Sequence, residues 1–145
     1  NLHIMLRYDL ERALISGDLN FEDLETAWND RFEADFGYKV DKASQGVLQD
    51  VHWSEALFGY FPTYSLGNVY AGCLYEKMVK DLPNLENDLE NGDPSRATDW
   101  LKAALQRHGS RYPAEELMFK ACGKAPSVDP FVRYIESKFS EIYDL

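Results

Sequence analysis

The sequence predicts an all-α fold, a compact multi-helix region spanning residues 1–145. Apolar residues recur at spacings of three and four along most of the chain, which is the period of a helix. Proline and glycine stand where helices begin and end, and no stretch alternates apolar and polar residues as a strand would. Hydrophobic residues make up 45% of the chain and aromatic residues 14%, which is enough to build a core. We therefore expect six or more helices and no sheet.

The first half of the chain predicts two helices followed by a loop. The first helix covers residues 2–15 and stops at Gly17. The second begins at Asn20, an N-cap residue with Asp23 placed as in a capping box, and ends at Gly37. The apolar residues of the first helix recur at Leu2, Met5, Leu6, Leu10 and Leu14, and the expected core stripe of the second is Phe21, Leu24, Trp28 and Phe32. Residues 38–53 predict a short helix and a loop.

The second half predicts one long helix and three short ones. Pro62 sits in the first turn of the long helix, where its missing N–H costs nothing, and Pro83 breaks or kinks that helix. The polar stretch that follows, as far as Gly92, is interpreted as a solvated turn. The three short helices open at Asp93-Pro94, Tyr112-Pro113 and Asp129-Pro130, and they place Trp100 and Phe139 in the core. A subdomain boundary near residue 92 is possible, but amphipathic helices should share one core.

Charge and cysteine content exclude several classes of partner. The net charge of −10 argues against nucleic acid, because phosphate contacts need clustered lysine and arginine. The same charge disfavours anionic lipid surfaces, and no apolar run approaches the roughly 20 residues that span a bilayer. Cys73 and Cys122 lack C-x-x-C spacing and are typical of buried thiols in a reducing compartment.

One region gathers most of the chemically useful side chains. Residues 46–53 follow the pattern G-x-x-Q-D-x-H-W, and residues 59–68 read G-Y-F-P-T-Y-x-L-G-N. Together these motifs resemble the metallocarboxypeptidases of the thermostable, carboxypeptidase Taq type. The resemblance runs through the chain, since residues 2–11 look like the segment that follows the I-R-x-x-A-D motif of that family.

The resemblance implies a metal site that this sequence does not supply. The family binds its divalent metal, zinc or cobalt, through H-E-x-x-H, a pair of histidines one helical turn apart with a glutamate between them. The three histidines here are His3, His52 and His108, so no such pair exists. We expect the chain to be the C-terminal part of a larger, mostly helical enzyme, with the metal-binding half upstream and with no activity alone.

The implied whole enzyme is a cytoplasmic homodimer that releases single residues from peptide C-termini. The alternative from a different class is a non-catalytic helical domain with a structural or interaction role. An arginine that grips the substrate carboxylate would lie before residue 1 in the family pattern, so that role does not transfer to Arg7.

The resemblance also assigns roles to particular residues. His52 and Tyr64 would stabilise the oxyanion that forms on the scissile carbonyl, with Tyr60 in reserve. Substrate-binding roles fall to Gln49, Asp50 and Tyr60.

Each assignment has a structural alternative. His52 can be a hydrogen-bonding residue beside a packed Trp53, and either tyrosine can be a core phenol. Asp50 can orient His52, although capping of the next turn is favoured, and Gln49 can be a loop amide. For Arg7, a salt bridge to Asp9 or Glu11 is favoured over ligand binding.

Overall fold

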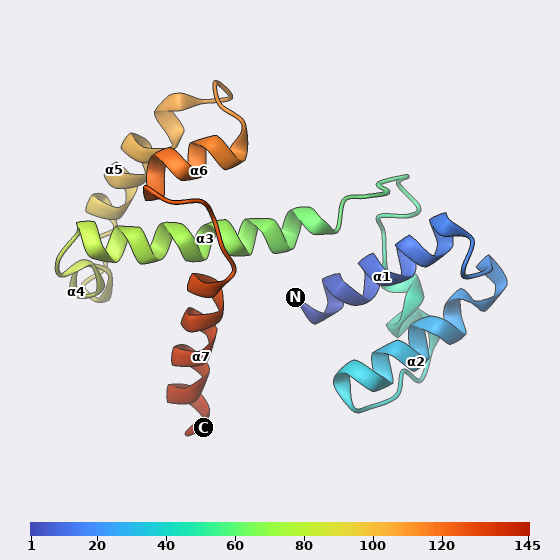
Figure 1. Ribbon diagram of the computed structural model, residues 1–145. Helices are drawn as coiled ribbons and strands as arrows, with labels where there is room; N and C mark the ends of the chain where they lie inside the picture. The colour runs from blue at the N-terminus through green and yellow to red at the C-terminus, as the bar shows by residue number, and fades with distance from the viewer. The chain divides into compact units, whose positions relative to one another are not determined.

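The computed structural model describes residues 1–145 and contains helices only. Its seven α-helices are α1 (Leu2–Ser16), α2 (Leu24–Phe36), α3 (Pro62–Asp81), α4 (Leu85–Glu90), α5 (Ser95–Ala104), α6 (Ala114–Cys122) and α7 (Asp129–Tyr143). Short 3₁₀ turns are η1 (Phe21–Asp23), η2 (Ala43–Gln45), η3 (Val47–Gln49) and η4 (Gln106–His108). The all-α prediction is confirmed (Figure 1). The polar stretch interpreted as a turn contains the short helix α4, which the sequence analysis missed.

The chain forms two units, residues 1–66 and residues 67–145, and the division falls within α3. Residue 92, near which the sequence suggested a possible subdomain boundary, lies inside the second unit. Each unit contains its own cluster of buried apolar side chains. Helical periodicity shows that a helix has an apolar face, but it does not show which other helix covers that face.

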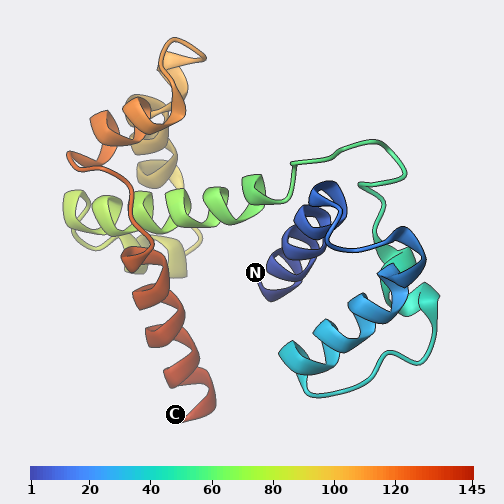
Figure 2. The same ribbon diagram turned by 45° about the vertical axis from the view of Figure 1, so that its right-hand side comes forward.

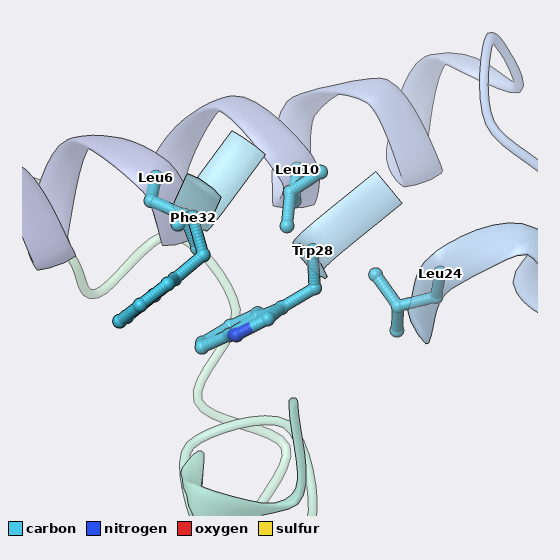
Figure 3. Close-up of a cluster of buried hydrophobic side chains, with 5 residues drawn as sticks. All are labelled: Leu6, Leu10, Leu24, Trp28 and Phe32. Carbon is cyan, nitrogen blue, oxygen red and sulfur yellow. The ribbon is translucent and has the colours of Figure 1, made fainter. Parts of the chain in front are cut away.

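The core of the first unit lies between α1 and α2. Figure 3 shows Leu6 and Leu10 on α1 facing Trp28 on α2, with the other two members of the cluster on α2, Leu24 and Phe32, beside them. Leu6 and Trp28 are almost completely buried. Both helices end at a glycine in the left-handed conformation, Gly17 and Gly37, as the sequence predicted.

Three local expectations were wrong. The capping box at the start of the second helix does not form, because the Asn20 side chain donates to the Asp23 carboxylate instead of capping the backbone. Phe21 was expected in the core but is 78% exposed, and Phe139 is 42% exposed. Phe21 lies in the 3₁₀ turn η1, whose tighter winding takes it off the α-helical stripe.

Gly46 sets the path of the loop that follows α2. A Cβ atom at Gly46 would lie 2.9 Å from Val40 Cγ1 and 3.3 Å from Trp28 Nε1. The first glycine of the G-x-x-Q-D-x-H-W motif therefore lets the backbone between η2 and η3 pack directly against the buried indole. This contact brings the rest of the motif back toward α1.

The second unit is built around α3. Cys73 on α3 packs with Met118 and Cys122 of α6, while α7 leaves α3 on the side away from α6 in both views (Figures 1 and 2). Glu76 on α3 accepts hydrogen bonds from Lys124 and Arg133, and these bonds lower the pKa of its carboxyl to about 2. The carboxylate is thus charged throughout the neutral range and ties α3 to the start of α7.

Two glycines on α3 provide a matched test of the packing between α3 and α7. A Cβ at Gly72 would lie 2.8 Å from the Phe131 backbone, whereas a Cβ at Gly67 would meet nothing within 4 Å. We expect Gly72→Ala to lower the free energy of unfolding by about 1–3 kcal/mol through overpacking. Gly67→Ala should raise it by about 0.5–1 kcal/mol, because alanine is the better helix former. Urea unfolding measures both, and equal stability of the two variants would refute the close approach of α7.

Candidate active site

The candidate site is assembled from α1, from the loop after η3 and from the first turn of α3, all within the first unit. The side chain of Asp50 lies at its centre and is 1% exposed. Arg7 on α1 donates from Nε to Asp50 Oδ2 at 2.7 Å. Arg7 was expected to pair with Asp9 or Glu11, and that expectation was wrong. The exposed Asp9 pairs with Arg31 of α2, whereas Glu11 is buried.

Asp50 also organises the turn that follows it. Its Oδ1 accepts the backbone N–H of His52 at 2.9 Å and that of Trp53 at 3.3 Å. The structure therefore has the capping contacts that the sequence favoured for Asp50. It also places Asp50 Oδ2 at 3.3 Å from His52 Nδ1, a close electrostatic contact whose geometry is not aligned for a hydrogen bond. Capping and orientation of the imidazole are not exclusive, because each uses a different carboxylate oxygen.

His52 joins this carboxylate to a phenol. Its Nε2 lies 2.9 Å from the Tyr64 hydroxyl, which comes from the first turn of α3. An imidazole protonated on Nδ1 would accept from the Tyr64 hydroxyl at Nε2, whereas one protonated on Nε2 would donate to the Tyr64 oxygen. Asp50, His52 and Tyr64 thus form a series, with the 42%-exposed tyrosine at the end that a ligand can reach.

A pocket of about 240 Å³ lies beside this series. Its polar lining comes from Arg7, Gln49, Asp50, His52 and Tyr64, and its apolar lining from Ile4, Val51 and Phe61. Four of the five residues singled out from the sequence therefore lie around one small cavity. The fifth, Tyr60, does not line it, but its ring packs 6.0 Å from that of His52 and 5.4 Å from that of Tyr64, measured between ring centroids.

The packing role considered for Trp53 agrees with its surroundings. Its ring meets those of Trp28 and Phe61 edge to face, with centroids 6.4 and 6.0 Å away. Its Nε1 donates to Glu11 Oε2 at 2.9 Å, a contact that the sequence analysis did not anticipate. The sequence does indicate that Glu11 lies near the core face of the helix, because it follows Arg7 by one helical turn and lies beside the core residue Leu10.

His3 shares the environment of Arg7. Its ring lies 4.6 Å from that of Phe36, and its Nδ1 is 3.2 Å from a guanidinium nitrogen of Arg7. Burial lowers the pKa of His3, and the charge of Arg7 lowers it further. Both effects favour the neutral form of His3 beside the Arg7 guanidinium.

The residues present do not fit a metal site. No group of three or more histidine, cysteine, aspartate or glutamate side chains is arranged to hold an ion. Catalytic zinc normally takes three protein ligands, and the site around His52 offers one imidazole whose second nitrogen faces a tyrosine. None of the helices has the length and apolar character needed to cross a membrane.

Comparisons with known proteins agree with the motifs. Residues 1–139 match the family described as carboxypeptidase Taq (M32) metallopeptidase. The chain is 41% identical over 143 residues to thermostable carboxypeptidase 1 of Thermus thermophilus, a match that covers 99% of the chain and 28% of the relative. Carboxypeptidase 1 of Bacillus subtilis is 37% identical over 142 residues, with 98% and 28% covered.

Solved structures show the same relationship. The M32 carboxypeptidase from Deinococcus radiodurans R1 superposes with a TM-score of 0.92 at 36% identity. That match covers 100% of this chain and 29% of the other chain. This chain therefore spans less than a third of the length of the relatives it matches. From its motifs, its helices and these matches, the chain belongs to the carboxypeptidase Taq (M32) metallopeptidase family.

Proposed function

We propose that this chain supplies the oxyanion-stabilising and substrate-contacting side of a metallocarboxypeptidase that releases single residues from peptide C-termini. The observation that carries the proposal is the series from Asp50 through His52 to Tyr64 at the edge of the pocket. A divalent metal, zinc or cobalt, held by residues outside this chain would supply polarisation of the scissile carbonyl. We place the metal ligands in other residues of the enzyme, because the sequence contains no H-E-x-x-H, and we expect the 145-residue chain alone to be inactive.

The chemistry assigned to this chain is hydrogen-bond donation to a developing negative charge. As a peptide carbonyl becomes tetrahedral, its oxygen gains charge, and a preorganised donor lowers the barrier by about 3–4 kcal/mol. Tyr64 can offer its hydroxyl, and His52 behind it holds that hydroxyl in place through Nε2. In this role the Nε2–H of His52 donates to the Tyr64 oxygen, so that the single phenolic hydrogen is free to donate to the oxyanion, while the Asp50 carboxylate lies 3.3 Å from Nδ1.

Gln49 and Tyr60 are assigned to substrate contact. Gln49 is exposed and lines the pocket, so its amide can pair with a peptide group. Tyr60 packs beside Tyr64 and presents a half-exposed ring next to the same opening. Arg7 is engaged by Asp50, so the structure gives no reason to use it for the substrate carboxylate.

Replacement of His52 tests this function in the enzyme that contains the chain. We expect His52→Ala to lower kcat by about 10²–10³ with metal content unchanged, because Tyr64 loses the partner that holds its hydroxyl. His108→Ala is the matched control, since His108 lies in η4 of the second unit. Peptide hydrolysis at saturating substrate, together with metal analysis and circular dichroism, measures the effect. Wild-type kcat in a folded, metal-loaded His52→Ala enzyme would remove the oxyanion role.

A further inference from the structure

Glu11 is a buried charged residue, at 4% exposure. It lies on α1 next to the core residue Leu10, and both of its oxygens are used. Oε2 accepts from Trp53 Nε1 at 2.9 Å, and Oε1 accepts from the Gly59 backbone N–H at 2.7 Å. Neither donor is a cation. Burying a carboxylate is costly, and hydrogen bonds from the protein must offset its lost hydration.

The two donors stand on either side of one loop segment. Trp53 directly follows His52, and Gly59 lies five residues before Tyr64. A single carboxylate therefore holds both ends of residues 53–59, the segment that separates the imidazole from the phenol. Within the segment, the Leu57 N–H donates to the His52 carbonyl at 2.8 Å, which keeps the turn closed on the His52 side.

A second contact from the same helix holds the beginning of the loop. Arg7 lies one helical turn before Glu11, so the two side chains leave the same face of α1. Arg7 binds Asp50, and Glu11 binds Trp53 and Gly59. Helix α1 thus anchors the motif before His52 and after it, although the contacts join residues 42 to 48 positions apart.

We propose that Glu11 is a positioning residue, whose carboxylate holds Trp53 and Gly59 so that His52 and Tyr64 stay in hydrogen-bond contact at the pocket. The proposal rests on the proposed function of His52 and Tyr64. Glu11 lines a different opening from that of His52 and Tyr64, so it acts through the loop and not on substrate.

Glu11→Gln tests the proposal with little change in volume. An amide has one acceptor oxygen, so its NH₂ group must face one of the two N–H donors, and that end of the loop is released. Asp9→Asn is the matched control. Asp9 is an exposed carboxylate of the same helix, and it forms an ion pair with Arg31 at the surface. If Glu11→Gln does not fold, Trp53→Phe removes the indole N–H and keeps an aromatic ring.

Nitrogen-15 NMR of the 145-residue chain reports the contact independently of catalysis. We expect Glu11→Gln to shift the Trp53 indole resonance and the Nε2 resonance of His52. The indole signal of Trp100 is the internal reference, because Trp100 lies in the second unit and its N–H donates to Asp81. Asp9→Asn should leave all of these signals in place. An unchanged His52 resonance beside a displaced Trp53 indole would overturn the proposal.

A double-mutant cycle in the enzyme that contains the chain separates positioning from general stabilisation. Glu11→Gln should lower kcat by about 10- to 100-fold in the wild-type background, and it should change kcat little once Tyr64→Phe has removed the hydroxyl. Independent effects would mean that Glu11 does not act through Tyr64, and would refute the proposal. If Tyr64→Phe itself leaves kcat unchanged, the proposed function fails, and the NMR result alone decides the positioning role.

Discussion

Tyr64→Phe is expected to lower kcat by about 10²–10³ in the metallocarboxypeptidase that we propose contains this chain. The substitution removes one hydroxyl and almost no volume, and that hydroxyl lies 2.9 Å from His52 Nε2 at the edge of the pocket. A donor that acts on the oxyanion contributes mainly in the transition state, so kcat should fall much more than KM rises. Steady-state kinetics on a C-terminally free peptide, with metal content measured in parallel, provide the test.

Tyr60→Phe is the matched control for this prediction. Tyr60 is also half-exposed and packs against both His52 and Tyr64, but it does not line the pocket. Its loss should change KM more than kcat, in keeping with substrate contact. If Tyr64→Phe keeps wild-type kcat with metal bound, Tyr64 is a packing residue. The oxyanion role would then pass to Tyr60 or to no tyrosine.

Arg7→Met is expected to lower the free energy of unfolding by about 3–5 kcal/mol, the usual result of removing one partner of a buried ion pair. The Asp50 side chain is 1% exposed and that of Arg7 is 15% exposed, so loss of the guanidinium leaves a buried carboxylate without its charged partner. Methionine keeps much of the packing where the Arg7 guanidinium carbon lies 4.8 Å from the Trp28 ring centroid. The measured loss therefore reports the unpaired carboxylate. Urea unfolding followed by tryptophan fluorescence gives the value.

Two further variants test whether the stability lost in Arg7→Met comes from the unpaired buried charge of Asp50. Arg31→Met removes a cation whose ion pairs to Asp9 and Asp35 lie near the surface, and it should cost at most about 1 kcal/mol. Arg7→Met combined with Asp50→Asn removes both charges while an amide oxygen remains to accept from the His52 and Trp53 N–H groups. The double variant should be more stable than Arg7→Met alone. A double variant that is less stable would contradict the explanation based on an unpaired charge.

Much of the secondary structure was predictable because its signals are local. Gly17 and Gly37 end helices since glycine adopts the left-handed conformation without a Cβ clash, and Pro62 begins α3 because a first-turn residue needs no N–H partner. Failures occurred where a neighbour outside the local pattern decided the outcome. The side chain of Asn20 bonded to Asp23, and the 3₁₀ turn η1 directed Phe21 into solvent.

In the candidate site, too, the sequence determined the local features and the tertiary structure determined the long-range contacts. The sequence by itself determined the family, the helical class and the grouping of Gln49, Asp50, His52 and Tyr64, because these residues lie close together along one motif region. Only the tertiary structure decided that Arg7 binds Asp50 and that Glu11 holds Trp53 and Gly59. Those contacts join α1 to a loop more than forty residues away. Side-chain spacing shows which face of a helix a charge occupies, but which distant group meets that charge depends on how the chain packs.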